Sequence, residues 1–261
     1  MKRTAPEKAN PSNRYLVPAL YRGLKVLELL AESPNGLSLG DMTARLRLPS
    51  ASLYRMLMTL VELNYAVREG NDLYRLSRKI LSLGYKSIDE SSVLEKSLGP
   101  MRQLRDASSE TVLVSTLYGD EGIVLNVIAS LHAVKVTVHV GHHFPLHTAA
   151  PGKAMLAYLP EEERNRITQS IVYTRFNPNT ITNASDLEKE LAAIRETGVA
   201  YDRGEEVEEI RCVAAPVFNH HGYPIAAICV SGPLSRMGKA KIKEHAESVK
   251  EYADMITSKF S

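Results

Sequence analysis

The chain has 261 residues, of which 44% are hydrophobic and 24% charged, so it can form one large domain or two smaller ones with packed cores. This composition excludes collagen-like, coiled-coil and wholly disordered chains. The sequence has no run of about 18 apolar residues, which a membrane span needs, and its two cysteines are too few for a disulfide framework. We therefore expect a cytoplasmic protein that has no membrane partner.

The net charge of +2 hides an asymmetry along the chain. Residues 1–86 contain 14 Lys and Arg and 7 Asp and Glu, a net charge of +7, and the other 18 basic and 23 acidic residues give residues 87–261 a net charge of −5. A basic first part joined to an acidic second part indicates that the first part binds a polyanion such as nucleic acid. The net charges of two ordinary solvated surfaces can also differ by this much. The sequence motifs are therefore needed to decide whether the first part binds nucleic acid.

The basic part begins with a predicted flexible arm, residues 1–14, which is rich in Lys, Arg, Pro and Asn and has little to bury. The pattern changes to a helical period at Pro18, and Ser33-Pro34-Asn35-Gly36 ends that first helix. Its apolar face is predicted to comprise Leu20, Leu24, Leu27 and Leu30.

Two further helices follow, separated by a short break at Leu48-Pro49. The second helix begins after Ser38, whose side chain can cap it, and the third covers about residues 50–63. The inner face of the third helix is predicted to comprise Leu53, Met56, Leu57 and Leu60. Three short helices with a tight turn between the second and the third form a helix-turn-helix candidate.

The outer face of the third helix is small and polar near its start, as a DNA-recognition helix requires. An ordinary surface helix can carry the same short side chains, so this face alone leaves both interpretations open. The candidates for contact with bases or phosphates are Ser50, Ala51, Ser52, Tyr54 and Arg55. The candidates for further contact with the DNA backbone are Arg22, Arg47, Arg68 and Arg75.

Two strand-like runs, residues 65–68 and 73–76, lie on either side of the turn sequence Glu69-Gly70-Asn71-Asp72 and are predicted to form a hairpin. Three helices followed by a basic hairpin make a winged helix-turn-helix, which we assign to residues 15–77. Residues 78–92 are predicted to be a helix that links this domain to the rest of the chain.

Three motifs of the basic part resemble the N-terminal domain of IclR-type bacterial transcription regulators. They are ALYRGLKVLELL in the first helix, SLYRMLMTLVELNY in the third, and YRLSRKILSLG, which closes the hairpin and opens the linker. The resemblance implies sequence-specific binding to a palindromic double-stranded DNA operator. Ser50 and Ala51 differ from the residues that are common in the family, so the resemblance does not give the operator sequence.

The acidic part, residues 93–261, has no Rossmann or P-loop glycine pattern, so no cofactor is predicted. Strands are predicted at residues 110–117, 122–128, 134–140, 212–218 and 223–230. Helices are predicted at residues 152–159, 161–167, 186–197 and 239–258. Hairpins with segregated helices indicate an α+β domain with an antiparallel sheet, and the whole resembles the GAF-like effector-binding domain of the same family.

The motifs PLHTAAPGKAML, YDRGEEVEEIRCVAAPVFNHHGYPIAA and ICVSGP carry that second resemblance. It implies a pocket for a small organic or aromatic acid or a sugar-acid derivative, in which the amides at the start of the helix near Gly152 can bind a carboxylate and a hydroxyl can orient it. Ile210, Cys229 and Pro151 depart from the usual family residues and make the lining bulkier and less polar. The residues implied as effector-binding are Ala150, Pro151, Gly152, Asp202, Cys212, Cys229 and Ser231.

Three other interpretations stay open. His139, His142, His143 and His147 crowd one strand end and loop and could bind a metal, although their spacing fits no known zinc motif, and a role in shaping the pocket mouth is the alternative. Cys212 with His220 or His221 could form a hydrolase nucleophile, but the turn places these histidines at the far end of the strand. In the third interpretation, the acidic part, residues 93–261, serves only to join copies of the protein into an oligomer.

We therefore predict a transcription regulator and not an enzyme. It is expected to form a homodimer, or a tetramer on DNA. Two winged helix-turn-helix domains related by two-fold symmetry match the symmetry of a palindromic site. The sign of regulation, the controlled genes and the effector cannot be read from the sequence.

Overall fold

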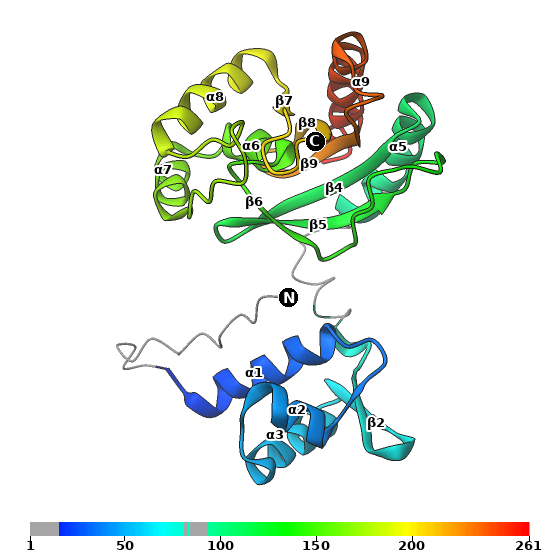
Figure 1. The fold of residues 1–261 in the computed structure, drawn as a ribbon, viewed down its shortest axis with the longest axis vertical. Helices are drawn as coiled ribbons and strands as arrows, with labels where there is room; N and C mark the ends of the chain where they lie inside the picture. The colour runs from blue at the N-terminus through cyan, green and yellow to red at the C-terminus, as the bar shows by residue number, and fades with distance from the viewer. Residues whose placement is uncertain (1–15, 81–82, 84–92, 261) are drawn as a thin grey trace. The chain divides into compact units, whose positions relative to one another are not determined.

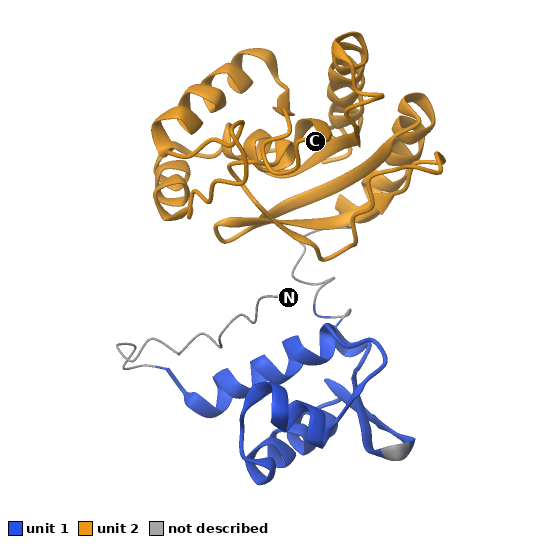
Figure 2. Cartoon of the chain, viewed as in Figure 1, with its two compact units in different colours: residues 1–89 blue, residues 90–261 orange. Residues whose placement is uncertain are grey.

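The computed structural model describes residues 16–80, 83 and 93–260. The predicted arm, residues 1–14, and most of the predicted linker helix, residues 78–92, lie outside the described residues. The chain divides into two compact units, Met1–Asp89 and Glu90–Ser261 (Figure 2). The α+β fold class predicted from the sequence is confirmed, with a helix-turn-helix in the first unit and an antiparallel sheet in the second.

The winged-helix part of the N-terminal unit, within the described residues 16–77, has three helices and a small antiparallel sheet (Figure 1). The helices are α1 (Pro18–Ala31), α2 (Leu39–Leu46) and α3 (Ser50–Glu62). The strands are β1 (Leu37–Ser38), β2 (Ala66–Glu69) and β3 (Leu73–Leu76), in the order β1-β3-β2. This arrangement is a winged helix, whose wing is the β2–β3 hairpin closed by the 3-10 turn η1 (Gly70–Asp72).

The core of this unit corrects the predicted face of α1. Val26 and Leu30 are buried, whereas Leu20 and Leu24 are 62% and 51% exposed. The two faces of α1 are both rich in leucine, and only one of them packs on α3 and the sheet. In α3, by contrast, the predicted inner residues Leu53 and Leu57 are fully buried.

Capping and one strained residue fix the turn between α2 and α3. The Ser38 hydroxyl accepts a hydrogen bond from the Asp41 backbone N–H, and the Asp41 carboxylate accepts one from the Ser38 N–H, so α2 begins with a capping box. Arg47 ends α2 in the left-handed conformation, with φ +52°, which redirects the chain into Leu48-Pro49 and α3.

The C-terminal unit is built on a six-stranded antiparallel sheet of order β6-β5-β4-β9-β8-β7. Its strands are β4 (Thr111–Tyr118), β5 (Glu121–Ile128), β6 (His143–Pro145), β7 (Ala200–Asp202), β8 (Ile210–Phe218) and β9 (Pro224–Pro233). One face packs against α5 (Val93–Ser108) and α9 (Lys239–Thr257), and the other against α6 (Ala150–Leu156), α7 (Glu161–Ser170) and α8 (Ala184–Thr197) (Figure 1). The two cores therefore lie on opposite faces of one sheet.

One predicted strand of this unit is wrong. Residues 134–140 form no strand and belong to an irregular segment that ends in a turn, and the edge strand beside β5 is instead β6. Their alternation reflects Val136 and Val138, which are half-buried, between exposed neighbours. The helix α5 and the short strand β7 were not predicted. Among the described helices, none has both the length and the apolar character that crossing a bilayer requires.

Candidate functional site

The structure places the predicted DNA-contact residues of α3 on its outer surface. Ser50, Ala51, Tyr54 and Arg55 are exposed, and Ser52 is half-buried. Because Leu53 and Leu57 anchor the opposite side of the helix in the core, this polar face is held outward.

The start of α3 can bind an anion through its backbone. Its N-cap is Pro49, which makes no side-chain capping hydrogen bond. The Ser52 and Leu53 N–H groups donate to Pro49 O, so the N–H groups of Ser50 and Ala51 are left for a ligand. The positive end of the helix dipole lies at the same place, and Ser50 adds a hydroxyl there. This geometry suits a DNA phosphate.

The arginines predicted to contact DNA differ in whether they already have partners within the protein. Within the described residues, exposed Arg22, Arg47 and Arg55 have no acidic partner. Arg68 Nε donates a hydrogen bond to Asp72 Oδ1 at 3.1 Å, across the wing tip. Arg75 also has partners, which lie beside a cavity at the base of the wing.

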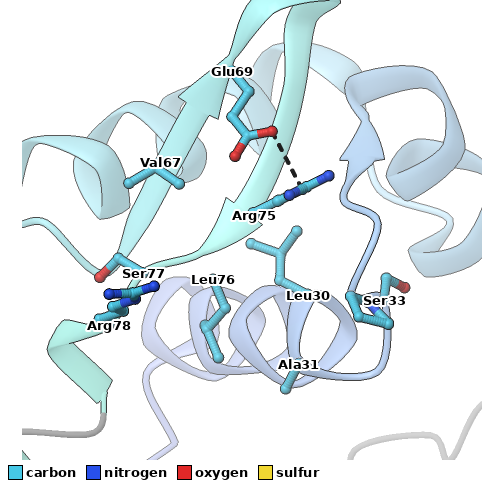
Figure 3. Close-up of a pocket in the computed structure, with 10 residues that line it drawn as sticks. Leu30, Ala31, Ser33, Val67, Glu69, Arg75, Leu76, Ser77 and Arg78 are labelled. Carbon is cyan, nitrogen blue, oxygen red and sulfur yellow. Dashed lines mark ion pairs between the residues drawn. The ribbon is translucent and has the colours of Figure 1, made fainter.

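That cavity, of about 680 Å³, lies between the end of α1 and the base of the wing (Figure 3). Arg75 Nε lies 3.3 Å from Glu69 Oε2, and Arg75 Nη2 donates a hydrogen bond to Asn35 O at 3.3 Å. Arg75 therefore holds the wing to the body of the domain, and a DNA contact would compete with these interactions. Arg78, at the end of the cavity, is drawn apart from this pair (Figure 3).

A second cavity, of about 220 Å³, lies on the face of the large sheet that packs against α6. Strand register explains its floor, because directly paired residues point to the same face: Leu113 pairs with Cys229, and Cys212 pairs with Ser231. Further lining residues come from β5, from the irregular segment after it, from β6, from the start of α6 and from β7 and the loop after it. The lining residues are Leu113, Val124, Val136, Thr137, Val138, His142, Phe144, Ala149, Pro151, Asp202, Glu206, Val207, Ile210, Cys212, Cys229 and Ser231.

Five of the seven predicted effector residues meet in this cavity, namely Pro151, Asp202, Cys212, Cys229 and Ser231. Ala150 and Gly152 do not line it. Ala150 is fully buried in the core, and a Cβ at Gly152 would lie 2.9 Å from Leu146 Cα, so the role of this glycine is close helix packing.

The loop after β7 is organised by Asp202. Its Oδ1 accepts hydrogen bonds from the backbone N–H groups of Gly204 and Glu205, both at 2.9 Å. Burial raises the pKa of Asp202, and the Glu205 amide and the nearby Lys153 act in the opposite direction. The same turn delivers Glu206 to the cavity, where Thr148 Oγ1 donates to Glu206 Oε2 at 3.4 Å.

Beneath that loop lies a buried ion pair. Lys153, on α6, is fully buried and donates a hydrogen bond to Glu205, which is 3% exposed. Glu190 and Arg203 extend the network, with Arg203 Nη1 2.7 Å from Glu190 Oε1. Burial raises the pKa of Glu205 to about 7, although Lys153 favours its ionised form.

The Cys212 thiol of the cavity is a poor nucleophile. A hydrogen bond with Cys229, together with burial, raises the pKa of Cys212 well above its usual value, and Cys212 Sγ donates to Ser231 Oγ at 3.2 Å. His220 and His221 lie in the turn at the opposite end of β8, so they form no pair with Cys212.

The four clustered histidines are dispersed in the structure. His142 lines the cavity, His143 Nδ1 lies 2.9 Å from Glu121 Oε2, and buried His147 contacts Thr174 O through Nε2. His139 is exposed. In the part of the chain that the structure describes, no group of three or more His, Cys, Asp or Glu residues is arranged to hold a metal.

Comparison with known proteins gives matches that cover both units of the chain. The family description "Bacterial transcriptional regulator IclR C-terminal" matches residues 85–258, and "IclR helix-turn-helix domain" matches residues 19–70. The chain belongs to the IclR family. It is therefore a DNA-binding transcription regulator with a C-terminal effector-binding domain, and its relatives are regulators and not enzymes, as the sequence predicted.

Among its relatives, the HTH-type transcriptional regulator XynR of Escherichia coli K12 is 30% identical over 237 residues, covering 90% of this chain and 94% of XynR. The crystal structure of the Thermotoga maritima IclR superposes with a TM-score of 0.75 at 26% identity, covering 93% of this chain and 98% of that one. An IclR homolog from Microbacterium hydrocarbonoxydans complexed with 4-hydroxybenzoate has a TM-score of 0.79 at 22% identity, covering 93% and 98%, a likeness of fold alone.

Sequence reasoning missed most of the cavity lining. Val136 and Val138 lie in the segment predicted as a strand, and Glu206 and Val207 lie in the acidic stretch of residues 205–209, which was not assigned to the site. His142 does line the cavity, as the alternative to a metal site expected. Part of the lining could have been found from the sequence. A run in which valines alternate with polar residues, and which has no strand to pair with, still has to bury its valines against an apolar surface or cavity.

Proposed function

We propose that residues 15–77 bind a palindromic operator and that residues 93–261 bind a small metabolite that changes operator affinity. The linker, residues 78–92, would transmit the change, and residues 1–14 would act as a basic arm. The observation that carries the proposal is that one unit has a helix with a polar outer face and no side-chain N-cap, and the other unit has a cavity lined mainly by apolar side chains.

For the operator contacts we propose two groups. Ser50, Ala51, Ser52, Tyr54 and Arg55 would contact bases or phosphates from α3. Arg22, Arg47 and Arg68 would contact the backbone, and Arg75 would do so only by leaving Glu69 and Asn35. The net charge of +7 on residues 1–86 supports strong salt dependence of binding.

We also propose a homodimer that assembles further to a tetramer on DNA, acting in the cytoplasm. The exposed Leu20 and Leu24 on α1 support self-association, because an apolar stripe on a small unit is stabilised when a second copy covers it. Two paired heads would place their α3 helices about one turn of DNA apart.

For the effector site we propose Pro151, Asp202, Cys212, Cys229 and Ser231, with Ala150 and Gly152 supporting the cavity from behind. The predicted acid class of the effector stays a prediction. The Microbacterium homolog carries an aromatic acid, and at its level of identity this is a property of that protein.

The test is selection of DNA from a random pool by the full-length protein, followed by anisotropy titration of the selected site. We expect a palindromic consensus and a Kd that rises steeply with salt. A metabolite that raises the melting temperature of the protein should shift that Kd, by a coupling of about 1–3 kcal/mol. If no consensus is selected, the proposal is refuted. If metabolites bind without changing the operator Kd, residues 93–261 do not regulate DNA binding.

A further inference from the structure

The two cysteines of the chain both line the C-terminal cavity, although they come from different strands. Cys212 of β8 pairs with Ser231 of β9, and Cys229 of β9 pairs with Ala214 of β8. Each cysteine is thus two residues away from the partner of the other, and residues two apart in a strand point to the same face of a sheet. The two thiols are therefore diagonal neighbours on the face that lines the cavity.

Hydrogen bonds connect the two thiols with each other and with polar oxygens of the cavity. Cys212 Sγ donates to Ser231 Oγ at 3.2 Å, and Cys229 is a further hydrogen-bond partner of the Cys212 thiol. The Asp202 carboxylate is also within hydrogen-bonding reach of Cys212. Cys212 is half-buried and Cys229 is buried, so a molecule that enters the cavity would reach Cys212 first.

The register favours an atom that bridges the two sulfurs over a direct disulfide. Diagonal neighbours on antiparallel strands have Cα atoms about 7–8 Å apart, whereas a disulfide needs about 7 Å or less. An atom between the two sulfurs adds a bond length to the reach of the pair.

The protonation of the thiols also limits the chemistry of a bound molecule. The hydrogen bond with Cys229, together with burial, raises the pKa of Cys212, so this thiol keeps its proton at neutral pH. A suitable partner therefore has to take up the thiol protons itself and leave an uncharged product, because an unpaired charge is costly in a buried site.

We propose that Cys212 and Cys229 form a dithiol site that captures a small, apolar trivalent arsenical. The Cys212 S–H adds across the As–O double bond of an arsine oxide, and its sulfur bonds to arsenic while its proton goes to oxygen. The Cys229 sulfur then displaces the resulting hydroxyl, which leaves with the Cys229 proton as water. Arsenic stays trivalent, no electrons are transferred to or from it, and the product with two As–S bonds is uncharged.

The rest of the cavity suits the organic group of such a molecule. Its volume of about 220 Å³ is below the usual range for drug-sized ligands, so it suits a group of the size of one phenyl ring. This capture needs the cavity and its two thiols and does not depend on operator binding, so it goes beyond the proposed function. The apolar side chains that would surround the organic group are Leu113, Val124, Val136, Val138, Phe144 and Ile210.

Titration of the reduced full-length protein with phenylarsine oxide, followed by native mass spectrometry, tests the site. We expect one adduct per chain, with the added mass of the reagent less one water. Glutathione, a monothiol, should not remove the adduct, whereas 1,2-ethanedithiol should remove it. Two linked contacts bind about 10²–10⁴ times more tightly than one, so Cys229→Ala and Cys212→Ala should each weaken binding at least about a hundredfold.

A matched control keeps two thiols in the chain but places them on opposite faces of the sheet. Cys229→Ala combined with Val230→Cys moves the second thiol by one residue along β9, into the core on the other face. This double variant should bind as weakly as the single variants. The melting temperature of each variant shows whether it is folded, and Cys212→Ala tests the pair at the less buried position.

The absence of an adduct with excess reagent, or an adduct that glutathione removes, would overturn the dithiol site. So would equal affinity in a folded single variant or in the control with thiols on opposite faces, and so would an arsenic atom that joins two chains. Operator selection is run without the arsenical, so its result tests the proposed function separately.

Discussion

Replacing Lys153 by Met tests how strongly the C-terminal unit depends on one buried ion pair. Lys153 is fully buried and its partner Glu205 is 3% exposed, so water screens the pair poorly. Removing one partner of such a pair costs about 3–5 kcal/mol, since the other is left without compensation. In a unit of this size about 1 kcal/mol lowers the melting temperature by about 2–4 °C, so we expect Lys153→Met to lower it by about 10 °C.

The pH dependence of that loss identifies its cause. The pKa of Glu205 is raised from 4.5 to about 7, so its contribution to stability is complete below pH 4.5 and is lost as the pH rises to about 7. Without Lys153, which favours the charged form, the pKa of Glu205 rises further. The loss then continues above pH 7 at about 1.4 kcal/mol per pH unit, so the gap between the wild type and the variant should widen from pH 7 to pH 9.

Differential scanning calorimetry of the full chain measures both effects, and far-UV circular dichroism can follow unfolding in a chain that has no tryptophan. The double variant Lys153→Met with Glu205→Leu should be less destabilised than the sum of the two single variants, because no buried charge is left. A melting temperature within about 2 °C of the wild type, or a gap that is the same at pH 6 and pH 9, would refute the reasoning.

Three further predictions concern the N-terminal unit. Arg55→Ala should weaken operator binding by about 1–3 kcal/mol and relax sequence preference in a binding titration, while Arg175→Ala, on the other unit, should not; an unchanged Kd removes Arg55 from the interface. Arg47→Gly relieves a left-handed residue of φ +52°, so its melting temperature should be at or above that of Arg47→Ala, and both should lower the salt slope of DNA binding by about 1. A lower melting temperature for the glycine variant would contradict this. Leu24→Glu should shift sedimentation towards monomer and weaken operator binding; an unchanged sedimentation profile would place the dimer contact elsewhere.

The sequence was most informative where periodicity and packing agree. In α3 the inner leucines Leu53 and Leu57 are buried and the polar face is outside, because a helix on a small core has one apolar stripe. In α1 the same argument was right for Leu30 and wrong for Leu20 and Leu24. Leu20 and Leu24 lie at helical spacing but are exposed, and periodicity cannot distinguish a stripe that packs within the unit from one left for another surface.

The predicted strand at residues 134–140 failed for a related reason. Val136 and Val138 alternate with exposed residues because they line a cavity, and no neighbouring strand supplies hydrogen-bond partners. Alternation of apolar and polar residues indicates a segment with one buried side. A β-strand also needs a neighbouring strand as hydrogen-bond partner, and the local sequence does not specify that partner.

Asp202 shows how a family resemblance can locate a site whose full lining only the fold reveals. The resemblance placed this residue in the effector pocket, and it does line the cavity. Its Oδ1 accepts hydrogen bonds from the Gly204 and Glu205 amides, in the loop that also brings Glu206 to the cavity. Glu206 belongs to the acidic stretch of residues 205–209, and no motif marked it as a lining residue. The position of a site therefore follows from a motif, and its selectivity follows from neighbours that only the fold brings together.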